Sequence, residues 1–107
     1  MIDRLPLPVE IPGDALADYC RRWKIVRLEV FGSVLREDFG PGSDVDFLVT
    51  FVPEARWTLF DLADAEDELA ALVGRRVDLV ERGPIERSRN WIRRRLILES
   101  AREIYVA

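Results

Sequence analysis

The chain has 107 residues, 49% hydrophobic and 34% charged, which is typical of one folded domain over residues 1–107 and excludes a disordered chain. A net charge of −4 argues against direct nucleic-acid binding through a basic surface, and one cysteine without histidine excludes an internal disulfide and a Cys/His zinc site. Because no apolar run reaches the roughly 20 residues that span a bilayer and no signal-peptide pattern opens the chain, we expect a cytoplasmic protein with no membrane partner.

The N-terminal part predicts a helix followed by a strand. Residues 14–23 carry apolar side chains at helical spacing on one face, namely Leu16, Tyr19, Cys20 and Trp23, and Asp14 is a candidate N-cap. Residues 25–31 alternate apolar with charged side chains, which predicts a strand with one buried face.

The central part predicts a turn, a second strand and a capped helix. Residues 33–38 are expected to form a short helical turn that a glycine- and proline-rich stretch ends, and residues 44–51 form a strand rich in Val and Phe. Thr58, with Asp61 three residues later, resembles a capping box and opens a helix that Gly74 ends.

The C-terminal part predicts a third strand and a long helix. Residues 76–80 have the pattern of the strand, and apolar side chains at helical spacing outline one stripe of a helix over residues 88–105. Trp23 and Trp91 lie on predicted apolar stripes and are expected in the core, whereas Trp57 is expected to be exposed.

The order of these elements predicts an α/β (α+β) architecture, in which helices flank a small sheet. The strands at residues 44–51 and 76–80 are joined through a helix of about sixteen residues. A connection of that kind suits parallel neighbours with a right-handed crossover.

Two aspartates lie two residues apart at the start of the second predicted strand. Asp44 and Asp46 therefore point to the same face, about 6.6 Å apart along the chain. At an effective dielectric constant near 20, two such charges repel by about 2.5 kcal/mol, comparable to the roughly 1.5–3 kcal/mol gained by burying one aliphatic side chain. Selection for stability alone would remove one of them, so the pair indicates a function.

A third aspartate occupies the middle of the next predicted strand. The charge of Asp78 lowers stability in a strand unless it has a partner. If the two strands are neighbours, Asp78 can converge with Asp44 and Asp46. Three convergent carboxylates form an oxygen cage for one or two divalent cations, which cancel the repulsion. The alternative is a surface turn, which is what most isolated Asp-x-Asp pairs are.

A Gly-Ser pair follows the first predicted strand and opens a turn. There the free backbone N–H groups and the hydroxyl of Gly32-Ser33 can bind phosphate oxygens, and Arg36 could reach the same phosphate. An ordinary turn with a serine cap and a solvated arginine would give the same sequence pattern.

Taken together, Gly32-Ser33, Arg36, the stretch "GSDVDFLV" at 42–49 with its Ser43, and "VDLV" at 77–80 resemble the polymerase-beta-type nucleotidyltransferase superfamily. Within it the chain is most similar to the minimal nucleotidyltransferases, which are encoded beside HEPN-domain toxins and act as their antitoxins. The resemblance covers nearly the whole chain and implies a small mixed sheet flanked by helices.

This resemblance implies an antitoxin that transfers AMP from Mg-ATP to a tyrosine hydroxyl of a HEPN-type toxin. Gly32 and Ser33 would hold the nucleotide phosphates, with Arg36 and Ser43 as further nucleotide-binding residues. Asp44 and Asp46 would bind two magnesium ions; Asp78 would complete the second metal site and accept the proton of the hydroxyl. Val34-Leu35 departs from the small residues that are commoner in the family, and two acidic groups in the loop after them could alter nucleotide affinity.

Two other functions stay open at this stage. One is an antitoxin that silences its partner by binding alone; the other is nucleotidyl transfer to a small molecule such as an antibiotic, for which the chain has no second domain. The arginines between residues 82 and 95 could dock an acidic partner or the triphosphate, or form a solvated helix face. Either a homo-oligomer or a hetero-oligomer is compatible with the sequence.

Overall fold

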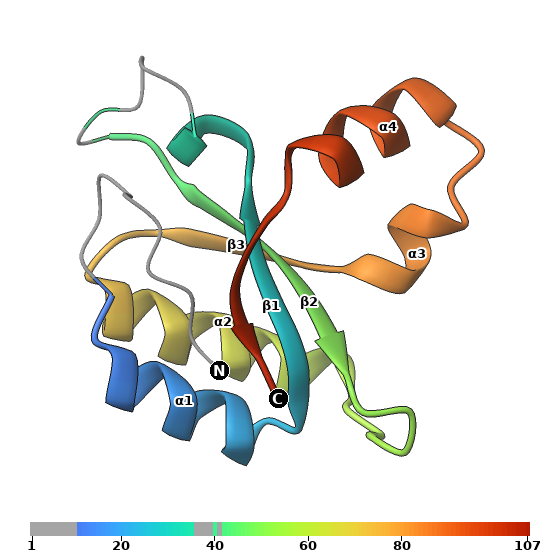
Figure 1. The fold of residues 1–107 in the computed structure, drawn as a ribbon. Coiled ribbons are helices and arrows are strands. Elements are labelled where there is room, and N and C mark those ends of the chain that lie inside the picture. The colour runs from blue at the N-terminus through green and yellow to red at the C-terminus, as the bar shows by residue number, and fades with distance from the viewer. Residues whose placement is uncertain (1–10, 36–39, 41) are drawn as a thin grey trace.

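A mixed four-stranded sheet organises the fold and carries helices on both faces (Figure 1). The computed structural model describes residues 11–35, 40 and 42–107. The strands are β1 (Ile25–Phe31), β2 (Val45–Phe51), β3 (Val77–Glu81) and β4 (Arg102–Val106), in the order β3-β2-β1-β4. The fold class expected from the sequence, a small mixed sheet flanked by helices, is confirmed.

Strand β2 lies between β1 and β3 in the sheet. It pairs antiparallel with β1, which in turn pairs antiparallel with the edge strand β4. On its other side β2 pairs in parallel with β3, as the connecting helix predicted. The ends of β2 and β3 that come first in the chain therefore lie together, beside the end of β1 that comes last.

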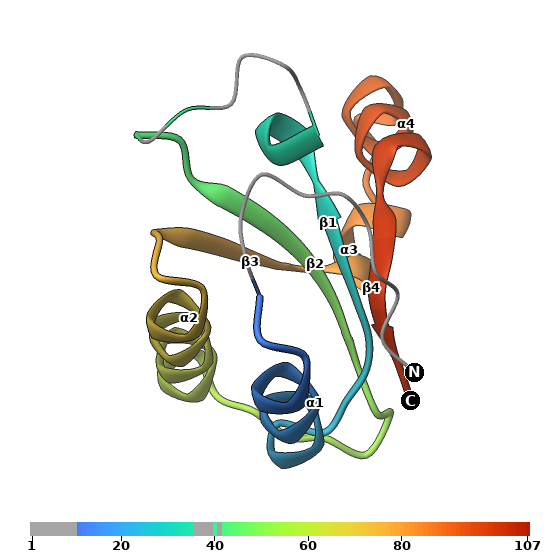
Figure 2. The ribbon, with the colours of Figure 1, turned by 60° about the vertical axis from the view of Figure 1, so that its left-hand side comes forward.

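Helices α1 (Gly13–Arg22) and α2 (Leu59–Val73) cover one face of the sheet (Figure 2). The predicted capping box opens α2: the Asp61 N–H donates to the Thr58 hydroxyl at 3.1 Å, and the Thr58 N–H donates to the Asp61 carboxylate at 2.8 Å. Gly74 ends the helix with φ +70°, also as predicted. The cap prediction for Asp14 is wrong, because Pro12 occupies the N-cap and Asp14 lies in the first turn.

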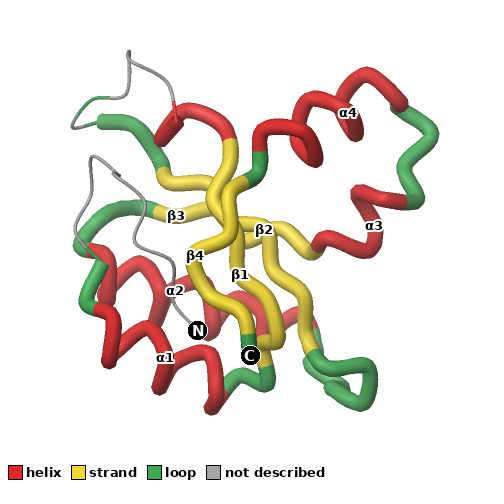
Figure 3. The backbone as a smooth tube through the Cα atoms, in the orientation of Figure 1, coloured by secondary structure: helices red, strands yellow, loops and turns green. Residues whose placement is uncertain are grey.

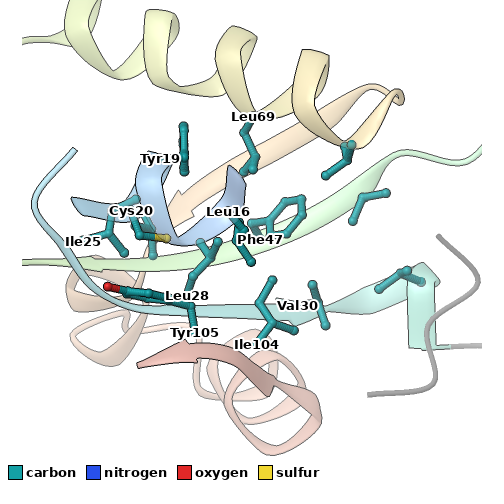
Figure 4. Packing of buried hydrophobic residues seen from close by; sticks show 14 residues of the cluster. Leu16, Tyr19, Cys20, Ile25, Leu28, Val30, Phe47, Leu69, Ile104 and Tyr105 are labelled. Atoms are coloured by element: carbon teal, nitrogen blue, oxygen red, sulfur yellow. The ribbon is translucent and has the colours of Figure 1, made fainter. Parts of the chain in front are cut away.

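The main core fills the space between these helices and the sheet (Figure 4). Its buried members include Leu16, Tyr19 and Cys20 of α1, Leu69 of α2, Leu28 and Val30 of β1, Val45, Phe47 and Val49 of β2, and Ile104 of β4. Tyr19 satisfies its buried hydroxyl by donating to the Ala65 carbonyl at 2.8 Å. This layer contributes most of the apolar burial that stabilises the fold.

The other face of the sheet carries shorter helical segments. They are the 3₁₀ turn η1 (Gly32–Leu35) and the helices α3 (Arg82–Glu86) and α4 (Trp91–Ser100), with α4 standing away from the sheet (Figure 3). A smaller buried cluster of Phe31, Leu48, Ile85 and Ile97 holds this side together. Within the described ranges, no helix has both the length and the apolar character needed to cross a bilayer.

The long C-terminal helix predicted over residues 88–105 is wrong. Helix α4 ends at Ser100, Ala101 adopts an extended conformation, and the chain continues as β4. No glycine or proline marks this change, and Ile104 and Tyr105 fit a helical stripe as well as a strand. Pairing with the free edge of β1 decides the outcome, and that tertiary contact leaves no local signal.

Two of the three tryptophan predictions are also wrong. Trp91 is 58% exposed on α4 instead of buried. Trp57 is half-buried: its indole N–H donates to the Trp23 carbonyl at 3.0 Å and its ring meets that of Trp23 edge-on at 5.0 Å. Trp23 packs against the main core, in line with the prediction.

Candidate active site

The predicted site residues gather where β1 ends and where β2 and β3 begin. Asp46 lies directly opposite Asp78 in the parallel register and opposite Phe31 in the antiparallel one. Register partners in a sheet point to the same face, so the two carboxylates lie side by side on the face that carries α4. Both line a pocket of about 580 Å³.

Asp44 takes a different position. It precedes the first residue of β2, and its carboxylate accepts an ion pair from Arg76 Nε at 3.1 Å. Among the residues that the structure describes, no group of three acidic, cysteine or histidine side chains is arranged to hold a metal ion. The structure therefore brings Asp46 and Asp78 together but not Asp44. Because Asp44 and Arg76 are 51% and 81% exposed, their pair contributes little and can be exchanged for another partner.

Gly32 brings the backbone of the turn against the carboxylate of Asp46. Its φ of +74° lies in the left-handed region, which favours glycine. A Cβ atom on this residue would overlap Asp46 Oδ2 and lie 3.4 Å from Asp46 Cγ. Glycine is thus needed both for the backbone angle and for the close approach, and Ser33 follows it in the same 3₁₀ turn.

Ser43 shapes the loop that enters β2. Its hydroxyl accepts from the Gly40 N–H at 3.1 Å, and its own N–H donates to the Gly40 carbonyl at 3.0 Å. The Arg75 guanidinium donates to the carbonyls of both residues, to Ser43 at 3.1 Å. The structure thus gives Ser43 a role in holding the loop before Asp44. The prediction for Arg36 lies outside the described residues.

Helix α4 and its N-cap residue form one wall of the site. Asn90, Ile92, Arg93, Leu96 and Ile97 line the pocket opposite Asp46 and Asp78. A second hollow of about 520 Å³ lies on the side of Gly32 and shares Phe31, Leu96 and Ile97 with the first. The site therefore has two adjoining hollows, one beside the glycine turn and one beside Asp78.

Sequence reasoning missed Asn90 as a pocket residue, and it considered Arg93 only as one member of the arginine cluster at residues 82–95. The Asn90 side chain accepts from the Arg93 N–H at 3.1 Å and so caps α4. An asparagine before an amphipathic run is a recognisable cap, but the sequence gives no sign that this helix folds back over the carboxylates. The arginine-rich composition of the segment was the available signal.

A buried ion pair fastens α3 beneath the site. Glu29 of β1 is only 2% exposed, and Arg82, the first residue of α3, donates to its Oε1 at 2.6 Å. Arg27 Nε lies 3.3 Å from the same oxygen, Glu29 Oε1. Because Glu29 is charged and buried, its ion pair with Arg82 fixes α3 and with it Ile85 of the small cluster.

On the opposite face of the sheet, Tyr19 and Cys20 are titratable groups that lie buried in the core. Burial raises the pKa of the Cys20 thiol to about 12, with Arg21 opposing the shift, so the thiol stays protonated at neutral pH. Burial likewise raises the pKa of Tyr19. Both groups act as core residues.

The residues at the site fit a divalent cation with oxygen ligands. Asp46 and Asp78 supply carboxylates in one pocket, and Gly32 leaves the space that any Cβ would fill. Magnesium prefers such hard oxygen donors, completed by water and substrate phosphates. Asp44 lies two residues before Asp46, and its carboxylate pairs with Arg76.

The chain is similar to known proteins in sequence. A family described as "Nucleotidyltransferase domain" matches residues 14–104. A protein of Methanocaldococcus jannaschii, named as a candidate protein adenylyltransferase, is 35% identical over 65 residues. That match covers 61% of this chain and 64% of the relative, so the chain spans less than two thirds of the length of this relative.

The fold is also similar to solved structures. A structure described as a candidate minimal nucleotidyltransferase has a TM-score of 0.63 and 34% identity, over 84% of this chain and 86% of that one. A toxin-antitoxin structure with AMP-PNP has a TM-score of 0.67 and 15% identity, over 91% and 75%. A complex of a tri-AMPylated Shewanella oneidensis HEPN toxin with an MNT antitoxin has a TM-score of 0.59 and 18% identity, over 89% and 70%. The last two likenesses concern the fold alone.

Proposed function

Because this chain belongs to the nucleotidyltransferase domain family, we propose that it transfers AMP from ATP to a tyrosine hydroxyl of a HEPN-type toxin and thereby acts as the antitoxin. The observation that carries the proposal is the placement of Asp46 beside Asp78 in one pocket, with the Gly32 turn against Asp46. Carboxylates beside a close-approaching backbone turn suit a metal-bound phosphate ester.

The names of the similar proteins support the choice of acceptor. The relative from M. jannaschii is named for protein adenylylation, and one of the similar structures contains an AMPylated HEPN toxin. These names favour an acceptor hydroxyl that arrives on another protein.

The donor nucleotide would occupy the Gly32 side of the site. The backbone N–H groups of the turn at Gly32 and Ser33 would bind phosphate oxygens, and the glycine allows the phosphates to approach without a side chain in the way. Arg36 would add a cation, and Ser43 would hold the entry loop in place.

Two magnesium ions would be held by Asp46 and Asp78, with Asp44 as the additional ligand. When bound, they would supply charge neutralisation for the triphosphate and activation of the acceptor hydroxyl. Asp46 is the residue between the two hollows, since Gly32 contacts it from one side and Asp78 pairs with it from the other.

The acceptor would enter on the Asp78 side. Asp78 is exposed and lines the larger pocket, so it can take the proton of the hydroxyl. The hydroxyl oxygen forms a bond to the α-phosphorus of ATP, the bond from that phosphorus to the bridging oxygen of pyrophosphate breaks, and pyrophosphate leaves with the electron pair. The AMP group then remains on the tyrosine.

The experiment is AMP transfer to a purified partner. The product of the gene adjacent to this one is incubated with the protein, magnesium and ATP labelled on its α-phosphate, and the label is located by mass spectrometry. We expect a tyrosine adduct that requires magnesium and disappears with Asp44→Asn or Asp46→Asn.

A matched control is Asp64→Asn, which removes an exposed carboxylate from α2 on the other face of the sheet. This variant should transfer AMP at the unaltered rate. Transfer that persists in both Asp44→Asn and Asp46→Asn, or a label that appears without magnesium, would refute the proposed function.

A further inference from the structure

Helix α4 exposes large apolar side chains beside the site. Trp91, Ile92 and Leu96 are 58%, 55% and 68% exposed, and Leu35 of η1 is 37% exposed. Soluble monomers rarely expose several large apolar side chains side by side, and such a patch commonly marks an interaction surface. We call the surface formed by Trp91, Ile92 and Leu96 together with Arg89 and Arg93 the α4 surface.

The α4 surface is continuous with the two hollows. Ile92 and Leu96 line the pocket that contains Asp46 and Asp78, and Leu96 also lines the second hollow together with Leu35. A protein segment that covers these side chains would therefore lie directly over the carboxylates. This position distinguishes it from a surface that merely adds contact area.

The charge of the α4 surface is positive. Residues 87–98 contain five arginines and no acidic residue, in a chain whose net charge is −4. The Arg94 guanidinium donates to the Ser88 carbonyl at 2.7 Å and Arg95 pairs with Glu99 at 3.1 Å. No described carboxylate forms an ion pair with Arg89 or Arg93, and Arg93 lines the pocket.

A second apolar patch provides an internal comparison. Leu59 and Phe60, at the start of α2, are 83% and 84% exposed. Helix α2 contains only acidic charged residues, namely Asp61, Asp64, Glu66, Asp67 and Glu68. The two patches thus have opposite charge, so an acidic partner is attracted to α4 and repelled from α2.

We propose that the α4 surface docks an acidic, amphipathic segment of the protein that carries the acceptor hydroxyl. The apolar side chains of the segment would cover Trp91, Ile92 and Leu96, while its carboxylates pair with Arg89 and Arg93. Docking there presents a hydroxyl to Asp78. The assignment of the docked protein as the acceptor rests on the proposed function; the docking itself does not.

The test measures binding without ATP. The probe is a fluorescein-labelled random copolymer of glutamate and tyrosine, and its affinity is measured by fluorescence anisotropy. We expect Arg93→Glu and Leu96→Asp each to weaken binding by about tenfold or more, which corresponds to the loss of one well-placed interface contact. Both side chains are exposed, and thermal unfolding checks that each variant folds.

Matched controls lie on the other side of the molecule. Arg21→Glu makes the same charge reversal on an exposed residue of α1, and Leu59→Asp makes the same apolar-to-acidic change on α2. Both controls should bind the copolymer like the unaltered protein. A lysine–tyrosine copolymer and a single-stranded oligonucleotide serve as competing ligands, and both should bind more weakly than the acidic copolymer.

Three outcomes overturn the proposal: undetectable binding of the acidic copolymer, equal binding by the α4 variants and the controls, or tighter binding of the basic copolymer or the oligonucleotide. The result also separates the two proposals. Binding that depends on α4 with no AMP transfer to any protein would leave the docking surface standing and refute the proposed function. AMP transfer that is unaffected by the α4 variants would leave the proposed function standing and refute the docking surface.

Discussion

The two faces of one sheet differ in almost every physical respect. The face covered by α1 and α2 is closed: its side chains are apolar and buried, and even the titratable groups Tyr19 and Cys20 are neutral members of the core. The face under α4 is open: it holds Asp46 and Asp78 side by side, two hollows, and large apolar side chains in solvent.

This difference follows from the alternation of β2. Val45, Phe47 and Val49 point into the closed face, while Asp46 points to the open one. At the start of β2 the odd positions therefore contribute to the main core, whereas the even position of Asp46 contributes to the site and that of Leu48 to the smaller cluster. The stability gained on one face allows the like charges and unfilled space of the other.

The largest effect is expected from removing a carboxylate on the open face. Asp46→Asn should lower the rate of AMP transfer by at least about 10²-fold, as loss of one preorganised charged group does at other active sites. The free energy of unfolding should stay within about 1 kcal/mol of that of the unaltered chain, because Asp46 lies outside the main core. Labelled-ATP assays and urea denaturation measure the two quantities. A variant that loses activity only because it unfolds would contradict the division between the faces.

A matched pair of leucines compares the faces in stability alone. Leu69→Ala empties a fully buried position on α2 and should lower the free energy of unfolding by about 2–5 kcal/mol. Leu96→Ala makes the same change on α4, where the side chain is 68% exposed, and should cost less than about 0.5 kcal/mol. Urea titrations give both values. Similar losses in the two variants would mean that α4 packs more tightly than the structure shows.

A matched pair of glycines tests the close approach at the site. Gly32→Ala and Gly74→Ala both force a Cβ onto a backbone with φ near +70°, which should cost about 1–2 kcal/mol each. At Gly74 the added atom meets nothing within 4 Å, whereas at Gly32 it meets the carboxylate of Asp46. We expect AMP transfer to fall in Gly32→Ala and to stay intact in Gly74→Ala. Equal activity of the two variants would show that the Gly32 turn does not shape the site.

The smallest effect concerns pH and the closed face. Because burial raises the pKa of Cys20 to about 12, the unfolded chain loses this proton at lower pH than the folded one. The contribution of the protonated Cys20 thiol to the free energy of unfolding is complete below pH about 8.5 and is lost as the pH rises toward 12. Between pH 8 and 9.5 the free energy of unfolding should therefore fall by about 1 kcal/mol. Urea titrations of the unaltered chain and of Cys20→Ala check this. The slope should be smaller in the variant, and an equal slope would exclude Cys20 as its source.

Local patterns predicted the elements whose signals lie within their own residues. Strand β1 begins and ends where its alternation does, and α2 is bounded by the capping box of Thr58 and by Gly74. The neighbouring positions of Asp46 and Asp78 followed from the parallel connection through α2. These features depend on spacing, caps and connection length, all of which are visible in the sequence.

Features that depend on contacts distant in sequence were missed. Strand β4 pairs with the edge of β1 that β2 leaves free, and Trp91 is 58% exposed on α4. Asp44 turns to Arg76, a residue thirty-two positions away, so its direction could not be taken from the spacing of Asp44 and Asp46. Asn90 and Arg93 line the pocket of Asp46 and Asp78 through contacts that are likewise distant in sequence.

The central claim is that the open face binds a metal–nucleotide complex between the Gly32 turn and the pair of carboxylates. A crystal structure of the chain with magnesium and a non-hydrolysable ATP analogue tests it most directly. We expect magnesium on Asp46 and Asp78, phosphates against the backbone of Gly32, and Asp44 released from Arg76. An analogue bound on the α1–α2 face, or phosphates placed away from Gly32 with no metal on Asp46, would contradict it.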